Sequence, residues 1–189
     1  MVLGVIPFAH THIQKILGEG DSAIDATLGN GNDILMLAKC VGKKGTVYGF
    51  DVQEQAIENS RKLLEKENLH EQVKLYQTGH ENITEIVGDD QKGKIKAITF
   101  NLGYLPKSNK EIITRPETTL KALEVSSEYI SSGGVIAVVV YTGHTGGQEE
   151  GDAVVQWAEN LEQNTFSVLS YSFINLSNNP PFLLLIEKK

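Results

Sequence analysis

The 189-residue sequence predicts an α/β fold with a doubly wound, mostly parallel sheet of seven strands, in which the last two strands form an antiparallel pair. Two observations carry this prediction. Apolar runs of strand length alternate with amphipathic stretches of helix length, which is typical of a parallel sheet covered by helices. The last two strand-like runs are joined by a short link that contains Ser-Asn-Asn-Pro-Pro, which leaves no room for a crossover helix. A chain of this length forms one domain, to which we assign residues 1–189.

The spacing of apolar residues indicates the elements of the first half of the chain. The stretch at 53–67 is amphipathic, because its apolar residues share one side while Glu58 stands four residues before Lys62 on the other. The other helices of this half are expected from shorter amphipathic stretches, and its strands from apolar runs of strand length. In order, we expect a helix at 8–17, strands at 22–26 and 46–50 separated by a helix at 33–41, the helix at 53–67, and strands at 73–76 and 95–100.

The second half repeats this alternation. Pro116 fits the first turn of a helix that runs to about Ser131, where Gly133 and Gly134 are expected to stop it. The continuous apolar run at 135–141 predicts a strand buried on both faces. The remaining expected elements are a helix that carries Val154, Trp157, Ala158 and Leu161, and strands at 167–174 and 182–187.

A tight turn at Gly29, Asn30 and Gly31 separates the first long strand from its helix, and Asp51 ends the next strand about 20 residues later. This arrangement is typical of βαβ units that bind adenosine: the glycines let the backbone approach the ligand, and the acid accepts both ribose hydroxyls. A dinucleotide fold has a third glycine where the helix receives a diphosphate, but Ile34 stands there. A generic turn, with Asp51 as a helix cap, is the alternative.

Two acids, Asp25 and Asp33, flank the turn. They would repel a diphosphate but suit a cofactor that carries an ammonium and a sulfonium group, which favours S-adenosylmethionine (SAM). We expect its methionyl part to contact Asp25, Asn30, Asn32 and Asp33, although Asp33 could equally cap the helix. Gln53 and His80, which follow strand ends, are candidates for the ribose and adenine side.

The loop D-A-T-x-G-x-G-x-D, the strand-end Asp51, the pair Gly79-His80 and the Asn-Leu-Gly-Tyr turn at 101–104 resemble successive motifs of class I methyltransferases. The ordered set GNGND, GFDVQ, GHE, FNLGYLP, TRPETT, YTGH with GGQEE, and NNPPFLLLIEK resembles a small bacterial family named putative rRNA methylases. That family is better described as tRNA 5-(aminomethyl)-2-thiouridine methyltransferases. The resemblance runs from about Ala9 to the C-terminus, and departs from the family after GYLP, where this chain lacks the glycines often found there.

The resemblance implies a methyl transfer from SAM to the aminomethyl group of a wobble uridine (U34) in the tRNA anticodon stem-loop. Some N-methyltransferases use an Asp/Asn-Pro-Pro-aromatic turn, of which this chain keeps the two ends, Asn101 and Tyr104. We expect Asn101 to orient the amine and also to contact the cofactor, and Tyr104 to pack on the uracil ring. His144 and Tyr141 are candidates to accept or relay the proton, although His144 could be a loop histidine without a role.

The formal net charge of −7 is unfavourable for an RNA-binding protein, so any RNA surface must be local. The best candidate is the segment at 107–121, where basic residues outnumber acidic ones. Lys107 and Arg115 are its leading substrate-binding candidates, and an ordinary solvated loop is the alternative. The family resemblance makes a homodimer plausible, which would extend this surface.

Cys40 is the only cysteine, which excludes an internal disulfide and a cysteine-based metal cluster. No apolar run is long enough to cross a membrane and no export signal is seen, so we expect a cytoplasmic protein without a metal. Three other functions stay open: a nicotinamide-dependent oxidoreductase, a module that senses SAM without catalysis, and a methyltransferase for rRNA or a small amine.

Overall fold

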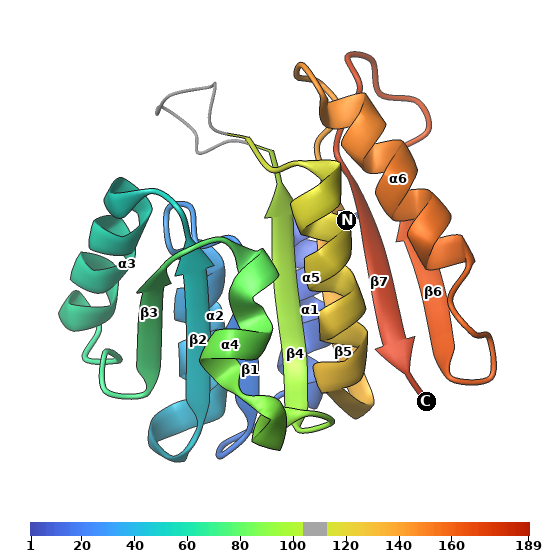
Figure 1. The fold of residues 1–189 in the computed structure, drawn as a ribbon. Coiled ribbons are helices and arrows are strands. Elements are labelled where there is room, and N and C mark those ends of the chain that lie inside the picture. Colours follow the sequence, from blue (N-terminus) through green and yellow to red (C-terminus); the bar gives the residue numbers. More distant parts are fainter. Residues whose placement is uncertain (104–112) are drawn as a thin grey trace.

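The computed structural model describes residues 1–103 and 113–189. Its sheet contains β1 (Ser22–Asp25), β2 (Thr46–Asp51), β3 (Val73–Gln77), β4 (Ile95–Leu102), β5 (Ile130–Val140), β6 (Phe166–Tyr171) and β7 (Phe182–Lys188). The strand order is β3-β2-β1-β4-β5-β7-β6 (Figure 1). Neighbours among β1 to β5 pair in parallel, whereas β7 runs antiparallel to β5 and β6. The predicted fold class is confirmed.

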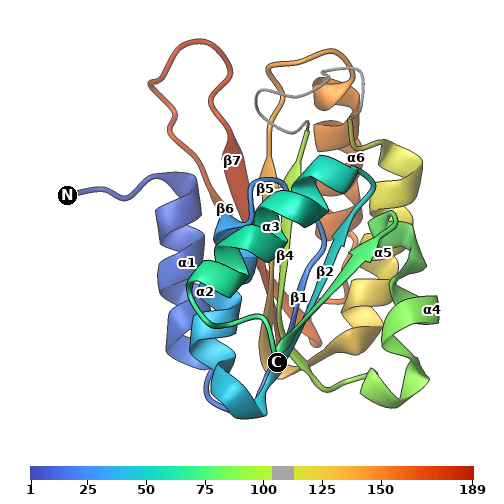
Figure 2. The same cartoon turned by 90° about the vertical axis from the view of Figure 1, so that its left-hand side faces the viewer.

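Helices cover both faces of this sheet. One face carries α1 (Val5–Ile16), α2 (Asn32–Val41) and α3 (Glu54–Lys66), and the other carries α4 (Ile83–Val87), α5 (Pro116–Tyr129) and α6 (Gly147–Glu159) (Figure 2). Short 3-10 turns lie at Gly42–Lys44, His80–Asn82 and Asp89–Gln91. None of the helices in the described part of the chain has the length and apolar character needed to cross a membrane.

The core lies on both sides of the central strands. In β5, residues 135–140 are all buried, as predicted from their continuous apolar run. The helix α3 buries Ala56, Ile57 and Leu64, which confirms the apolar side expected from the sequence. A parallel strand covered on both faces needs apolar residues at every position, whereas a helix needs them only on one side.

Gly133 and Gly134 do not stop a helix, contrary to the prediction. The helix α5 already ends at Tyr129, and both glycines lie inside β5. The pairing of β4 with β5 shifts register between Ile95 and Ala97, so the glycines fall in a bulge of the longer strand. Gly133 has φ +66°, and a Cβ on Gly134 would meet the carbonyl oxygen of Ser131 at 2.9 Å. The two glycines therefore allow the backbone to form this bulge.

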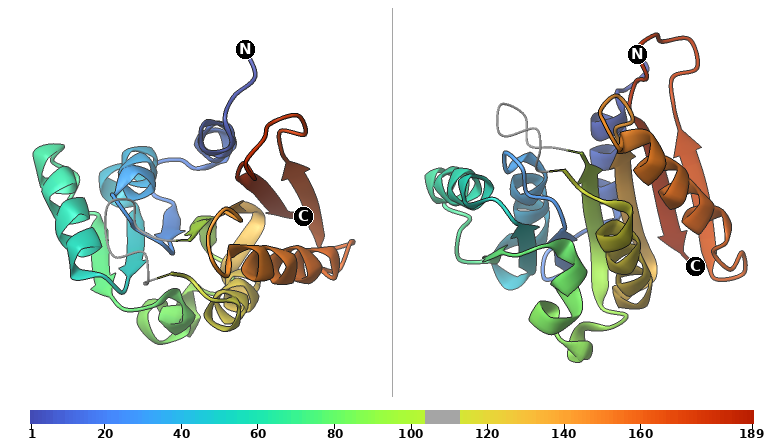
Figure 3. Two further views of the ribbon diagram at one scale, coloured as in Figure 1. Left: turned by 90° about the horizontal axis from the view of Figure 1, so that it is seen from above. Right: turned by 45° about the horizontal axis from the view of Figure 1, so that its top comes forward.

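Two of the helices also differ from expectation. The helix α1 begins at Val5 and not at Phe8, and the short helix α4 was not predicted. The N-terminal segment lies beside the connection between β6 and β7 (Figure 3), where the Tyr171 hydroxyl donates to the Leu3 carbonyl at 2.7 Å. This contact places the start of α1 near the carboxyl ends of the parallel strands, where ligands bind in such folds.

Candidate functional site

A cavity of about 820 Å³ opens at the carboxyl ends of the parallel strands. It collects most of the residues predicted from the sequence: Gly29, Asn30, Asn32, Asp33, Asp51, Gln53, His80, Asn101, Arg115, Tyr141 and His144. Asp25 and Gly31 do not line it. Tyr104 and Lys107 lie outside the described residues. Sequence reasoning therefore selected residues that are far apart in the chain but converge on one hollow.

Asp51 ends β2, and its carboxylate accepts hydrogen bonds from two backbone segments, the glycine turn after β1 and the residues just after β2. Its Oδ2 accepts the Gly29 N–H at 3.0 Å, and its Oδ1 accepts the Gln53 N–H at 2.9 Å. Burial raises the pKa of Asp51, while the two backbone donors act in the opposite direction. Each carboxylate oxygen keeps a further lone pair, so the pair of oxygens can accept two vicinal hydroxyls from the cavity.

Gly29 and Gly31 serve different ends. Both have positive φ, at +52° and +82°, which favours glycine. Gly29 lines the cavity. Gly31 faces α3, because a Cβ there would meet Ser60 Oγ at 3.0 Å and Ser60 Cα at 3.1 Å. The second glycine therefore allows α2 and α3 to approach each other.

His80 lines the cavity but is largely buried, whereas loop histidines are usually exposed. Its Nδ1 lies 3.2 Å from the Ala26 carbonyl oxygen, and its ring meets the edge of Phe100. Because a carbonyl only accepts, Nδ1 carries the proton and Nε2 is left as an acceptor. Burial lowers the pKa of His80, so the imidazole is neutral at physiological pH.

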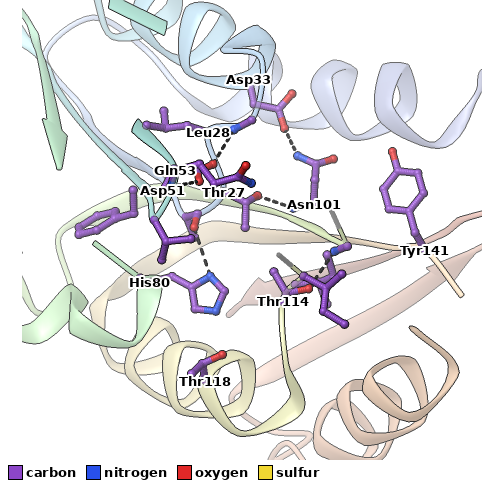
Figure 4. Close-up of a pocket in the computed structure, with 18 of the residues that line it drawn as sticks. Thr27, Leu28, Asp33, Asp51, Gln53, His80, Asn101, Thr114, Thr118 and Tyr141 are labelled. Atoms are coloured by element: carbon purple, nitrogen blue, oxygen red, sulfur yellow. Dashed lines mark hydrogen bonds between the residues drawn. The ribbon is translucent and has the colours of Figure 1, made fainter. Parts of the chain in front are cut away.

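A chain of short hydrogen bonds fixes Asn101 at the end of β4. Its Nδ2 donates to Asp33 Oδ2 at 2.6 Å, and Asp33 Oδ1 lies 2.6 Å from His10 Nε2 on α1. The backbone N–H of Asn101 donates to Thr27 Oγ1 at 2.7 Å. A carboxylate only accepts, so the amide nitrogen must face Asp33 and the amide oxygen must point away from it. Figure 4 shows that this oxygen faces the side of the cavity where Tyr141 stands.

Asp25 lies behind this wall and is fully buried. Its Oδ1 accepts the Thr27 N–H at 3.2 Å, and its Oδ2 has no hydrogen-bond partner among the described residues. Burial, and then the charge of Asp33, raise the pKa of Asp25 well above its ordinary value of 3.8. The methionyl contact expected for Asp25 would therefore have to pass through an intervening group such as water.

This raised pKa predicts a pH dependence of stability. Folded Asp25 binds its proton more tightly than the unfolded chain does, so the ligand-free protein should lose stability as pH rises from 3.8 through the raised pKa. Asp25→Asn removes this titration. Relative to the variant, the parent should lose about 1.4 kcal/mol for each pH unit by which the pKa is raised. Urea unfolding of both proteins between about pH 4 and 9 measures the drift.

The exposed Asp90 supplies the control for that experiment. Asp90→Asn changes an exposed side chain, so the pH dependence of its unfolding free energy should stay close to that of the parent. A constant free-energy difference between parent and Asp25→Asn across this range would contradict the prediction.

Tyr141 and His144 follow β5 and line the cavity, and Figure 4 shows Tyr141 on the far side of the cavity from Asp51. Burial, and then the charge of Asp33, raise the pKa of Tyr141, so its phenol stays protonated at neutral pH. His144 Nδ1 lies 3.0 Å from the Thr145 carbonyl oxygen. A Cβ on Gly103 would approach His144 Nε2 at 3.3 Å, so glycine lets the β4 turn pass close to this ring.

Several residues that line the cavity or contact its lining were missed by sequence reasoning. His10 reaches Asp33 from α1, and Ile6 and Thr114 reach the cavity from other segments. No local pattern marks them, because their roles depend on how distant elements pack. Val52 had a usable signal: it follows the strand-end acid, and 54% of its surface is exposed at the cavity wall. No cluster of metal-ligating side chains occurs within residues 1–103 and 113–189.

Comparison with known proteins places this geometry in a family. The family model described as "Putative rRNA methylase" matches residues 47–187. The chain belongs to this family. A chloroplastic tRNA (mnm(5)s(2)U34)-methyltransferase from Arabidopsis thaliana is 36% identical over 189 residues, which cover 96% of this chain and 68% of that protein. The family predicted from the ordered motifs is thus confirmed.

Solved structures agree with this membership. A putative rRNA-methylase from Clostridium thermocellum is 41% identical, with a TM-score of 0.95 and 100% of both chains covered. A putative methyltransferase from Streptococcus mutans in complex with SAH is 40% identical, with a TM-score of 0.90 and the same coverage. Outside the putative rRNA methylase family, a SAM-dependent O-methyltransferase from Thermotoga maritima, at 19% identity and a TM-score of 0.67, shares the fold alone.

Proposed function

We propose that this protein transfers a methyl group from SAM to the aminomethyl nitrogen of 5-aminomethyl-2-thiouridine at wobble position 34 of tRNA. Membership of a methylase family supports the reaction class. The substrate is suggested by the Arabidopsis relative, whose name specifies the methylated wobble uridine. The orientation of the Asn101 amide is the observation in this chain that carries the proposal.

The cofactor prediction is confirmed by the comparisons, because the Streptococcus mutans relative was solved in complex with SAH, which is SAM without its methyl group. The residues of the cavity fit this molecule. Asp51 offers two acceptors for ribose hydroxyls, exposed Val52 offers apolar surface for a purine, and acidic Asp33 suits an ammonium group. When bound, SAM supplies an electrophilic methyl group on a sulfonium centre.

The acceptor side needs a group that accepts N–H bonds from an amine without competing as a donor. Asn101 provides it, because its Nδ2 is held by Asp33 and only its oxygen faces the cavity. An amine held by this oxygen keeps its lone pair free to aim at the methyl carbon. Holding the reacting atoms in line lowers the entropy cost of the step and is worth several orders of magnitude in rate.

The amine must lose a proton before it reacts, since an ammonium has no lone pair. Methyl transfer then forms one nitrogen–carbon bond, breaks one sulfur–carbon bond, and leaves a second proton for release. Tyr141 is protonated at neutral pH, so it can donate or relay but does not act as the first base. His144 and solvent in the cavity remain the candidates to receive these protons.

The proposed macromolecular partner is the anticodon stem-loop, which carries position 34. Because the net charge is −7, we infer that RNA binds a local basic surface at the cavity mouth. Exposed Arg115 precedes α5 there and lines the cavity. A homodimer would place a second copy of this surface alongside. Sedimentation of the protein with and without an anticodon stem-loop tests the assembly.

Nucleoside mass spectrometry tests the reaction itself. tRNA from a strain that lacks this methyltransferase is incubated with the pure protein and SAM, and the wobble nucleosides are then quantified. The proposal requires conversion of 5-aminomethyl-2-thiouridine to its methylaminomethyl form. Methylation of rRNA or of a free amine, with tRNA left unchanged, would overturn the substrate assignment.

The basic surface gives a second measurable expectation. Lys107→Ala combined with Arg115→Ala should weaken tRNA binding while SAM affinity stays unchanged. The log–log salt slope of binding should shrink by about 0.7 to 0.9 for each phosphate that is no longer neutralised. Lys39→Ala combined with Lys62→Ala, on solvated helix positions outside the cavity lining, is the charge-matched control. Parental tRNA affinity and salt slope in the first double variant would place the RNA surface elsewhere.

A further inference from the structure

Two motifs that the reaction leaves unexplained, TRPETT and GGQEE, meet at one buried carboxylate. Glu150, the last residue of GGQEE, lies in the first turns of α6 with 1% of its surface exposed. Its Oε2 accepts the Thr114 hydroxyl at 2.6 Å, and its Oε1 accepts the Thr119 hydroxyl at 2.7 Å. Both threonines belong to TRPETT. No ion pair to Glu150 is found within the described ranges 1–103 and 113–189.

Through Thr114, the hydrogen bonds of Glu150 extend to the turn that follows Asn101. Thr114 Oγ1 accepts the Gly103 N–H at 2.8 Å, and the Thr114 N–H donates to the Gly103 carbonyl at 2.9 Å. Because a carboxylate only accepts, the Thr114 hydroxyl must turn its hydrogen toward Glu150. Its lone pairs therefore point to Gly103, two residues after the amide that faces the acceptor.

Through Thr119, the contacts of Glu150 extend to the side of the cavity expected to bind the cofactor. Thr119 is fully buried, and its Oγ1 lies 3.5 Å from His80 Nε2. His80 in turn contacts the Ala26 carbonyl at the start of the cofactor loop. The Glu150 carboxylate thus lies between two parts of the site. One is the turn at 101–103, here called the acceptor turn, and the other is the cavity wall at Ala26 and His80, on the side expected to bind the cofactor. Burying it costs free energy unless its bonds are made, which predicts a use for it beyond packing.

We propose that Glu150 is a positioning residue, which sets the acceptor turn through Thr114 and Gly103 and thereby aligns Asn101 for methyl transfer. This inference rests on the proposed function only for the identity of the acceptor. What Glu150 supplies is a fixed pair of hydrogen-bond acceptors, since neither of its partners among the described residues is charged. Its substitution therefore changes the rate of transfer more than the affinity for SAM.

The side chains that can replace Glu150 separate geometry from charge. Glu150→Gln keeps an oxygen for Thr114, while its NH2 can donate to Thr119, whose own hydrogen can turn to His80 Nε2. Glu150→Met has a similar length but offers no acceptor, so the Thr114 hydroxyl loses its fixed direction. Thr114→Val removes the hydroxyl that joins Glu150 to Gly103, whereas Thr114→Ser keeps that hydroxyl. Glu149→Met, on the exposed neighbouring position, is the matched control.

Steady-state kinetics with SAM and tRNA give the first readout. We expect Glu150→Met and Thr114→Val each to lower kcat by roughly 10-fold or more, because small misplacements of reacting atoms are costly. The KM for SAM should change by less than about 3-fold, and Glu150→Gln and Thr114→Ser should restore most of kcat. The double variant Glu150→Met/Thr114→Val should be no slower than the slower single one, since both act through one path.

Amide hydrogen exchange at Gly103 gives a second readout that needs no substrate. Exchange should be faster in Glu150→Met and Thr114→Val than in the parent, Glu150→Gln and Glu149→Met. If the parent methylates no tRNA, the substrate assignment fails, while Gly103 exchange still decides the positioning role. Unchanged exchange in Glu150→Met would overturn the proposal. Equal losses of kcat in Glu150→Gln and Glu150→Met, or fully additive losses in the double variant, would also overturn it.

Discussion

Replacing Asn101 by alanine is expected to lower the rate of methyl transfer at saturating SAM and tRNA by roughly 100-fold or more. The variant loses the oxygen that holds the amine in line, and it also frees Asp33, which then has only His10 as a described side-chain partner. SAM affinity should change little, because the ribose contacts of Asp51 are untouched. Single-turnover rates, with tRNA from a strain that lacks the enzyme, measure the effect on the chemical step.

Two companion variants sharpen this measurement. Asn160→Ala, at the exposed end of α6, should transfer methyl at the parental rate. Tyr104→Phe should be mild if the ring only packs on the uracil, and severe if its hydroxyl handles the proton. A near-parental rate for Asn101→Ala would remove this residue from the mechanism and direct attention to Tyr141 and His144.

Asp51→Ala is the second substitution with a large expected effect, on cofactor affinity. The charge-assisted bonds between a carboxylate and ribose hydroxyls are worth roughly 1.5 to 3 kcal/mol, so the Kd for SAM should rise by roughly 10- to 100-fold. The substitution also frees the Gly29 and Gln53 N–H groups that the carboxylate holds. Isothermal calorimetry with SAM measures the change, and Asp90→Ala, an exposed acid outside the cavity lining, is the control.

Titration of the same proteins with NAD tests the alternative cofactor. A dinucleotide should bind poorly, because the turn lacks a third glycine and two acids flank it. Tight binding of NAD together with no binding of SAM would contradict the cofactor assignment.

Most of the fold was accessible from local pattern. A short, valine-rich apolar run such as 135–141 favours a strand covered on both faces, and a short link between the last two runs forces an antiparallel pair. Gly133 and Gly134 were misread because a glycine pair suits both a helix end and a strand bulge. The partner strand decides between these, and its register cannot be read from one segment.

The residues of the candidate site were also only partly predictable from the sequence. Asp51 and Gly29 were predictable, because a glycine turn and a strand-end acid stand at a known spacing along the chain. His10 and Glu150 were not, because each meets its partners only after helices pack on the finished sheet. Gly31 was assigned to the ligand, although its freedom serves contact between α2 and α3. Spacing along the chain predicts contacts within a βα unit, whereas contacts between units need the tertiary structure.

The central place of β1 bears on how the boundaries of this family should be drawn. β1 lies between β2 and β4, so the first 46 residues supply a middle strand of the sheet. They also supply the glycine turn, Asp33 and His10. The family model starts at residue 47. A boundary placed at that residue divides one seven-stranded sheet in two and separates the glycine turn after β1 from the turn that follows Asn101.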